Sequence, residues 1–300
     1  MTAAPDWGRG FTHPLSGGGR LRVRETGEGP PLLLLHGFTG SSLSWDPAII
    51  QRLGRSFRVL APDLPGHGMS PIPELGPHDS VAGHGIEWLS GELRRLMEGG
   101  GAERFSVLGY SMGGRVALAM AVGAPESIEA LILESASPGL EGEEERDARR
   151  RFDDALANAI EARGMDWFSE YWPSLPLFET RHALPADVAA GVQAVLSRND
   201  PTGLAFALRR FGTGEQRSLW HDLGRVQAPT LLMAGALDKK FARINRAMAA
   251  EIGGSRLVVI PGIGHTIHLE APDLWADLVS LHLQRHSPAE GPSPVLRTHA

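Results

Sequence analysis

The chain has 300 residues, of which 42% are hydrophobic and 21% are charged, and this composition is typical of a globular protein. Its 29 basic and 35 acidic residues give a formal net charge of −6, so the sequence lacks the basic surface that a nucleic-acid partner requires. The chain contains no cysteine, which excludes disulfides, thiolate metal sites and cysteine nucleophiles.

No targeting segment is evident in the sequence. The first ten residues lack the apolar region of a secretory signal, and the longest strictly apolar run, Val116 to Val122, is far shorter than the roughly 20 residues that span a bilayer. We therefore expect a cytoplasmic protein without a membrane partner. Residues 1–10 and 285–300 have little apolar content, and we expect both segments to be mobile.

Short apolar runs alternate with helical patterns along most of the chain. The expected strands are Leu32 to Leu35, Arg58 to Ala61, Phe105 to Leu108, Ala130 to Leu133, Thr230 to Met233 and Leu257 to Ile260. This alternation predicts an α/β fold with a doubly wound, mostly parallel sheet. Upstream, Arg20 to Glu25 alternates apolar and basic residues and predicts an edge strand of a hairpin, with its turn at Gly17 to Gly19.

The alternation stops between Pro138 and about His221, over a distance too long for an ordinary crossover. We expect a helical cap in this region, and its first helix begins with three glutamates from Glu143, near the positive end of the helix dipole. One face of that helix is expected to carry Arg149, Phe152, Leu156 and Ile160. The predicted division is a core of residues 11–137 and 223–284 with a cap of residues 138–222.

The segment Gly109-Tyr110-Ser111-Met112-Gly113 follows an expected strand and begins an expected helix. In this context G-x-S-x-G indicates a tight turn that lifts a nucleophilic serine above the sheet edge. We predict that Ser111 carries the chemistry. The backbone N–H of Met112 would then contribute to an oxyanion hole.

A serine hydroxyl needs a histidine within hydrogen-bonding distance, oriented by a carboxylate. Asp238 lies just beyond the strand expected at Thr230, and His265 lies just beyond the strand expected at Leu257. These residues give the chain order Ser, Asp, His of the α/β-hydrolase superfamily. Glu134, which follows the preceding strand, is the alternative acid in a weaker position.

Two further segments resemble the same superfamily. His36-Gly37-Phe38 follows an apolar strand and resembles the loop whose backbone completes the oxyanion hole, which makes Phe38 the second candidate donor. The segment D-L-P-G-H-G-M-S at 63 to 70 resembles an architectural turn, so we assign no catalytic role to His67. A serine at 111 disfavours the related dehalogenases and epoxide hydrolases, which use an aspartate there.

Basic residues point to an anionic substrate. Arg115 lies one helical turn after Ser111, and the spacing of Arg149 points it along the apolar face of the first cap helix. Arg198 and Lys240 could complete a pocket for a molecule with several carboxylates. Lys239 and Lys240 are the chain's two lysines, so the rest of its 29 basic residues are arginines. A single arginine is therefore weak evidence for a binding site.

Several longer motifs resemble one family of this superfamily, the 2-succinyl-6-hydroxy-2,4-cyclohexadiene-1-carboxylate synthases, which are lyases of menaquinone biosynthesis. The similarity runs from about Leu32 to Leu283. It rests on H-G-F-T-G-S at 36 to 41, G-Y-S-M-G-G-R at 109 to 115, E-S-A-S-P-G-L at 134 to 140, E-E-E-R-D-A-R at 143 to 149, S-E-Y-W-P-S-L-P-L-F at 169 to 178, R-N-D-P-T-G-L-A at 198 to 205, L-D-K-K-F at 237 to 241 and G-I-G-H at 262 to 265.

The resemblance implies elimination of pyruvate from 2-succinyl-5-enolpyruvyl-6-hydroxy-3-cyclohexene-1-carboxylate, by proton abstraction and 2,5-elimination. Ser111, activated by His265 and Asp238, would remove the proton, and Phe38 and Met112 would hold the enolate oxygen. The substrate-binding residues implied by the resemblance are Arg115, Arg149, Arg198, Tyr110, Tyr171, Trp172 and Lys240. Glu141 stands where some members have glutamine, and we expect it to be peripheral.

Two other functions are compatible with the same residues. One is a hydrolase of esters or carbon–carbon bonds in acidic small molecules, and the other is a non-catalytic relative that binds a small molecule. No metal constellation or dinucleotide fingerprint accompanies the triad, so we expect no cofactor and a small polycarboxylate as partner. The sequence gives no indication of the oligomeric state.

Overall fold

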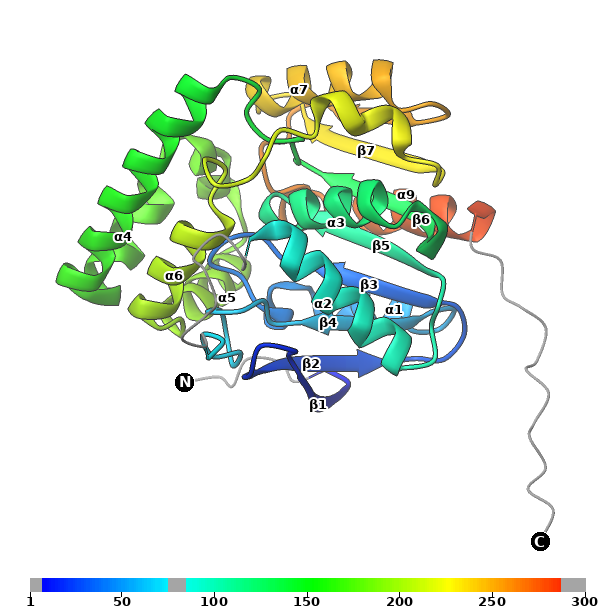
Figure 1. The fold of residues 1–300 in the computed structure, drawn as a ribbon, viewed down its shortest axis with the longest axis horizontal. Coiled ribbons are helices and arrows are strands. Elements are labelled where there is room, and N and C mark those ends of the chain that lie inside the picture. Colours follow the sequence, from blue (N-terminus) through cyan, green and yellow to red (C-terminus); the bar gives the residue numbers. More distant parts are fainter. Residues whose placement is uncertain (1–6, 75–84, 287–300) are drawn as a thin grey trace, which may run out of the picture.

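The computed structural model describes residues 7–74 and 85–286. Within these residues, eight strands form one sheet in the order β1-β2-β4-β3-β5-β6-β7-β8 (Figure 1). The strands are β1 (Arg9–Pro14), β2 (Arg20–Thr26), β3 (Pro31–Leu35), β4 (Arg58–Pro62), β5 (Phe105–Tyr110), β6 (Ile128–Glu134), β7 (Thr230–Gly235) and β8 (Arg256–Ile260). All pairings from β4 to β8 are parallel, which confirms the predicted α/β class.

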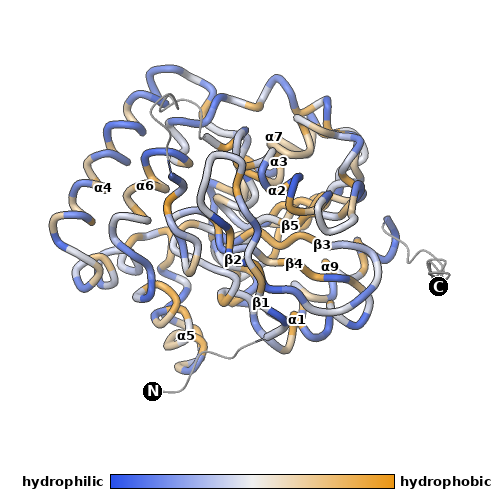
Figure 2. Tube along the Cα trace, turned by 60° about the horizontal axis from the view of Figure 1, so that its bottom comes forward, coloured by the Kyte–Doolittle hydropathy of each residue, from blue (hydrophilic) through white to orange (hydrophobic). Residues whose placement is uncertain are grey.

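The sheet separates two apolar layers because successive side chains of a strand point to opposite faces. Leu33 and Leu35 of β3 pack with α2 (Ile86–Gly99), α3 (Met112–Gly123) and α7 (Lys239–Glu251). Leu32 and Leu34 pack on the other face with α1 (Pro47–Leu53) and α9 (Pro272–His286). Figure 2 shows the hydrophobic colouring concentrated in the central strands, while the outer helices are mixed.

The N-terminal hairpin differs from its prediction in one respect. β1 and β2 are antiparallel, and Gly18 and Gly19 adopt φ values of 90° and 83° in the turn that joins them. The predicted edge strand, β2, also pairs with β4, so β1 forms the edge of the sheet instead. Alternate residues of β2 are accessible because one face of the sheet is exposed to solvent there, and a strand inside a sheet can expose one face without being an edge strand.

Helices fill the chain between β6 and β7. They are α4 (Glu143–Tyr171), η4 (Trp172–Ser174), η5 (Pro176–Ala183), α5 (Ala186–Ser197), α6 (Pro201–Phe211) and η6 (Trp220–Arg225). α4 and α6 lie side by side at one end of the sheet (Figure 1) and share an apolar cluster that includes Leu156, Ile160 and Leu204. Non-helical torsion angles at Gly164 interrupt α4.

The predicted inward face of α4 is partly wrong. Leu156 and Ile160 are buried, but Phe152 is 53% exposed and Asp153 occupies the buried position instead. Phe152 lies three residues after Arg149 and Asp153 lies four residues after it, so either could share its helical face. Contact with α6 buries Asp153 and leaves Phe152 exposed.

The shorter helices are η1 (Ser42–Ser44), η3 (Pro125–Ser127) and α8 (Ile267–Glu270). The predicted N-terminal tail overlaps β1, which begins at Arg9, and residues 1–6 and 287–300 lie outside the described part of the chain. None of the helices in residues 7–74 and 85–286 is long and apolar enough to cross a membrane.

Candidate active site

Ser111 lies at the turn between β5 and α3, with φ 51° and ψ −107°. The flanking glycines make this turn possible. A Cβ at Gly109 would lie 2.3 Å from the carbonyl oxygen of Gly113, and one at Gly113 would lie 2.1 Å from the carbonyl oxygen of Leu35. Side chains at these positions would push α3 away from the sheet, so the glycines hold Ser111 above the sheet edge.

The three predicted triad residues lie within hydrogen-bonding distance of one another. Ser111 Oγ donates to His265 Nε2 at 3.1 Å, and His265 Nδ1 donates to Asp238 Oδ2 at 2.6 Å. His265 and Asp238 are both buried. The arrangement fixes the imidazole with its proton on Nδ1, which leaves Nε2 free to accept the proton of the serine.

Glu134, the alternative acid, makes different contacts. Its Oε1 accepts a hydrogen bond from His268 Nδ1 at 2.8 Å, and its Oε2 accepts one from Trp275 Nε1 at 2.8 Å. Glu134 is fully buried and joins β6 to α8 and α9. The geometry therefore favours Asp238 over Glu134 as the acid that faces His265.

The loop after β3 lies beside Ser111. A Cβ at Gly37 would be 2.7 Å from the ring of Tyr110 and 3.5 Å from Ser111 Cβ. Thr39 adopts φ 70°, a conformation that favours glycine and that concentrates at functional loops. Because Met112 is the first residue of α3, its N–H has no partner within the helix. This packing places Gly37, the residue before Phe38, beside Ser111, and Met112 directly follows Ser111 in the chain.

Buried polar groups hold this loop in place. Leu64 N donates to His36 Nε2 at 2.9 Å, and His36 Nδ1 donates to the carbonyl oxygen of Gly37 at 2.8 Å. Burial lowers the pKa of His36 to about 4, so the ring is neutral and keeps its acceptor nitrogen. Burial also lowers the pKa of His67 to about 3, and this residue packs edge-on against Phe38.

Arg115 is buried in α3, one helical turn after Ser111. Its Nη1 donates to Gln216 Oε1 at 2.9 Å, and its Nη2 donates to the carbonyl oxygen of Phe211 at 2.6 Å. Burial, reinforced by the nearby charge of Arg149, lowers the pKa of Arg115 to about 10. The negative charge of Asp153 opposes this lowering of the pKa, and the guanidinium remains charged at neutral pH, although no carboxylate oxygen of residues 7–74 and 85–286 lies within 4.0 Å of it.

Arg149 pairs with a carboxylate that the sequence interpretation missed. Its Nε donates to Asp153 Oδ1 at 2.8 Å, while Asp153 Oδ2 is buried without a hydrogen-bond partner. Burial raises the pKa of Asp153, and Arg149 opposes this shift. Their spacing of four residues on one helix is the sequence signal that could have predicted this ion pair.

The other predicted polar contacts are not brought into the site. Arg198 caps the end of α5 and is exposed, and Lys240 is exposed at the first turn of α7, where it lies 5.7 Å from the ring of Phe241. Glu141 is also exposed, as expected for a peripheral residue.

The predicted aromatic residues divide into two groups. Tyr110 is buried and directly precedes Ser111, and its ring lies 5.4 Å from the ring of His265. Trp172 packs 5.1 Å from Phe38, and its buried Nε1 has no partner. Tyr171 instead stacks on Trp167 at 5.0 Å, within the cap.

A cavity of about 410 Å³ adjoins the triad. Its walls come from the loop after β3, from Tyr110 and from the cap, and they include Phe38, Thr39, Tyr110, Trp172, Arg181 and Leu196. Ser111, Asp238 and His265 do not line the cavity themselves, but Tyr110, which directly precedes Ser111, and Phe38 do. Sequence interpretation missed Arg181, because nothing distinguishes it from the many other arginines of the chain.

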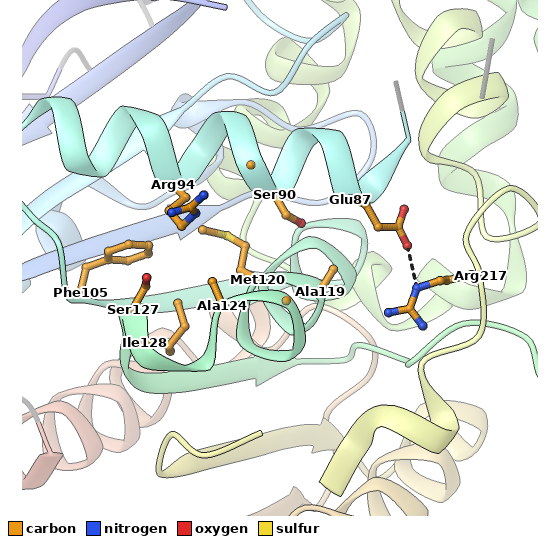
Figure 3. Close-up of a pocket in the computed structure, with 12 residues that line it drawn as sticks. Glu87, Ser90, Arg94, Phe105, Ala119, Met120, Ala124, Ser127, Ile128 and Arg217 are labelled. Carbon is orange, nitrogen blue, oxygen red and sulfur yellow. Dashed lines mark ion pairs between the residues drawn. The ribbon is translucent and has the colours of Figure 1, made fainter. Parts of the chain in front are cut away.

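Figure 3 shows a smaller cavity, of about 200 Å³, between α2 and the later part of α3. An ion pair between Glu87 and Arg217, with a closest approach of 3.3 Å, lies at one side of it. The cavity is lined by Phe105 and Ile128, the first residues of β5 and β6. It lies at the opposite ends of the strands from Ser111 and takes no part in the candidate site.

The fold and the site define the class of protein. Residues 30–272 match the family model of the α/β hydrolase fold, and the chain belongs to this family. Within it, the chain belongs with the 2-succinyl-6-hydroxy-2,4-cyclohexadiene-1-carboxylate synthases, as the following relatives show.

Two relatives and one solved structure establish the closer relationship. The chain is 34% identical, over 87% of its length and 94% of the relative, to a Bacillus subtilis (strain 168) protein provisionally named as this synthase. It is 31% identical to the synthase of Salmonella schwarzengrund (strain CVM19633), over 81% of this chain and 89% of the relative. A structure of MenH from S. aureus is similar with a TM-score of 0.81 and 32% identity, and the match covers 89% of this chain and 98% of that one.

Proposed function

We propose that this chain is a lyase that eliminates pyruvate from 2-succinyl-5-enolpyruvyl-6-hydroxy-3-cyclohexene-1-carboxylate and yields 2-succinyl-6-hydroxy-2,4-cyclohexadiene-1-carboxylate. The single observation that carries the proposal is the hydrogen-bonded set of Ser111, His265 and Asp238, with the buried Arg115 one helical turn after Ser111, in a chain 34% identical to a relative of that name. A neutral ester would not require a buried cation one helical turn from Ser111.

The chemistry begins with a proton transfer. Ser111 Oγ gives its proton to His265 Nε2 over 3.1 Å, and Asp238 stabilises the resulting imidazolium. The alkoxide then removes the proton α to the succinyl ketone. The electron pair of that C–H bond moves into the enolate, whose oxygen accepts hydrogen bonds from the N–H groups of Phe38 and Met112.

Elimination completes the reaction. The enolate electrons return through the ring, the C–O bond to the enolpyruvyl group breaks, and enolpyruvate departs. A proton from the imidazolium reaches the leaving oxygen, and the enol rearranges to pyruvate. No water is consumed and no acyl-enzyme forms, so Ser111 acts as a base rather than as a nucleophile.

The direct test is product analysis with the purified chain and freshly prepared substrate. The proposal predicts that pyruvate and the conjugated cyclohexadiene appear together in equal amounts, faster than in the enzyme-free control. Consumption of substrate with uptake of water, or release of pyruvate at the control rate by folded protein, would instead favour the hydrolase or the binding protein.

A further inference from the structure

One segment of the cap, η5, lies over the loop that carries His265. The ring of Phe178 lies 6.1 Å from the ring of His265, and Thr180 lies so close to the loop that a Cβ at Gly264 would be 2.1 Å from Thr180 Oγ1. η5 therefore covers the base of the proposed triad, and the side chain that follows Thr180 is Arg181.

Arg181 is held in a defined position. Its Nε donates to Thr266 Oγ1 at 2.9 Å, its Nη2 lies 3.3 Å from the hydroxyl of Tyr110, and its guanidinium lies 4.1 Å from the centre of the Phe178 ring. Thr266 directly follows His265 and Tyr110 directly precedes Ser111. Guanidinium has five N–H donors, and these contacts use two of them.

The charge of Arg181 has no counterpart in the described part of the chain. Arg149 pairs with Asp153, and Arg209 pairs with Glu161, but no carboxylate among residues 7–74 and 85–286 lies within 4.0 Å of the Arg181 guanidinium. Its two oxygen partners, Thr266 and Tyr110, are uncharged hydroxyls. A half-buried guanidinium without an anion is well suited to a bidentate contact with a carboxylate.

The guanidinium also faces the space where a ligand would lie. Arg181 lines the cavity of about 410 Å³ together with Phe38 and Tyr110, which flank the nucleophile. Arg115 and Arg149 do not line this cavity, and Arg149 is paired with Asp153. Among the described residues, Arg181 is thus the arginine that lines this cavity, and no carboxylate oxygen lies within 4.0 Å of its guanidinium, although Asp46 and Asp187 also line the cavity.

We infer that Arg181 binds a carboxylate of the substrate and, through this contact, orients the substrate against Ser111. The inference rests on the proposed lyase function. It assigns to the cap a substrate-binding residue in addition to those predicted from sequence. It also explains why the side chain of Arg181 reaches Thr266, which follows His265, and Tyr110, which precedes Ser111.

The test compares Arg181→Gln, Arg181→Met and Arg181→Lys with a matched control, Arg151→Gln, which removes an exposed arginine of α4. The neutral variants should raise the KM for pyruvate release at least about 10-fold, with a smaller change in kcat, because a charge-assisted contact in the bound state is lost. Arg181→Lys should recover part of the loss, and Arg151→Gln should match the wild type. Two neutral variants are used so that misfolding of one leaves a second.

A binding measurement separates this inference from the proposed function. Calorimetry with propane-1,2,3-tricarboxylate, which needs no turnover, should show about 10-fold weaker binding to the neutral variants than to the wild type. Arg181-dependent binding without any enzymatic pyruvate release would leave the anion site standing and remove the lyase function. Unchanged KM and unchanged probe affinity in the neutral variants would overturn the inference, and so would a loss of kcat alone, which would assign Arg181 to packing around His265.

Discussion

Ser111 occupies a backbone conformation that a non-glycine residue rarely adopts, with φ 51°. Such a conformation costs about 1–3 kcal/mol and persists where the surrounding structure enforces it. Here the enforcing contacts are the close approaches of Gly109 and Gly113. This strained conformation places the Ser111 hydroxyl beside His265 at the cost of some local stability.

At this scale, the two candidate acids give opposite predictions. Asp238→Asn should lower kcat for pyruvate release by about 10³-fold or more, because an amide no longer enforces the Nδ1–H tautomer of His265. Glu134→Gln should leave kcat within about threefold of the wild type but lower the free energy of unfolding by about 1–3 kcal/mol, because it disrupts buried hydrogen bonds to His268 and Trp275. Steady-state kinetics and urea unfolding of both variants check this, and the reverse ranking would identify Glu134 as the catalytic acid.

The role of Arg115 is tested by comparing two reactions. Arg115→Ala should reduce kcat/KM for elimination at least about 10-fold more than for hydrolysis of p-nitrophenyl acetate, since the neutral ester has no carboxylate for this cation. Equal losses on both substrates would show that Arg115 supports the fold around Gln216 and Phe211 instead of the substrate.

At the scale of elements, one close contact between the cap and the core is made by Gly203 with Gly66. A Cβ at Gly203 of α6 would lie 2.4 Å from the carbonyl oxygen of Gly66, in the turn after β4. A Cβ at Gly191 of α5 would meet no atom within 4 Å. An alanine at Gly203 would therefore clash with the core, whereas an alanine at Gly191 would change only the helix propensity of α5.

Gly203→Ala should destabilise the protein by about 1–3 kcal/mol, because α6 must move away from the core. Gly191→Ala should stabilise it by about 0.4–1 kcal/mol, because alanine restricts the unfolded chain and suits a helix interior. Urea unfolding of both variants measures the difference. Equal free energies for the two variants would contradict the close packing of α6 on the core.

The elements also show which features could be predicted from the sequence. The strands from β3 to β8 were predicted because buried parallel strands appear as continuous apolar runs. The position of β2 inside the sheet and the exposure of Phe152 could not be predicted, because each depends on a neighbour, β4 or α6, that lies far away in the chain.

In the site, motif spacing predicted the residues that the structure brings together around Ser111. The pairing of Arg149 and the exposure of Arg181 to the cavity depend on tertiary contacts that no local pattern encodes.

At the scale of the whole molecule, buried histidines make stability depend on pH. Burial lowers the pKa values of His36 and His282 to about 4 and that of His67 to about 3. In the unfolded chain each would titrate near 6.5. Below that pH the unfolded state binds protons that the folded state does not, so their contribution to stability is present above about pH 6.5 and is lost as the pH falls toward 4.

We expect the free energy of unfolding to decrease between pH 7 and pH 5, with His36 alone contributing on the order of 2 kcal/mol of that decrease. His36→Gln should flatten the dependence, since glutamine does not titrate and its amide oxygen can still accept from Leu64 N. Urea unfolding at several pH values checks this, and an unchanged slope in the variant would show that His36 does not contribute.

The central claim is that Ser111 drives an elimination, and the most direct measurement compares pyruvate release by the wild type and by Ser111→Ala, with the spontaneous decay of the substrate subtracted. The account predicts fast release by the wild type and a loss of about 10³-fold or more in the variant, while both proteins show the same melting temperature. Equal net release by the two proteins would contradict a role for Ser111. Release by neither protein would contradict the lyase function itself.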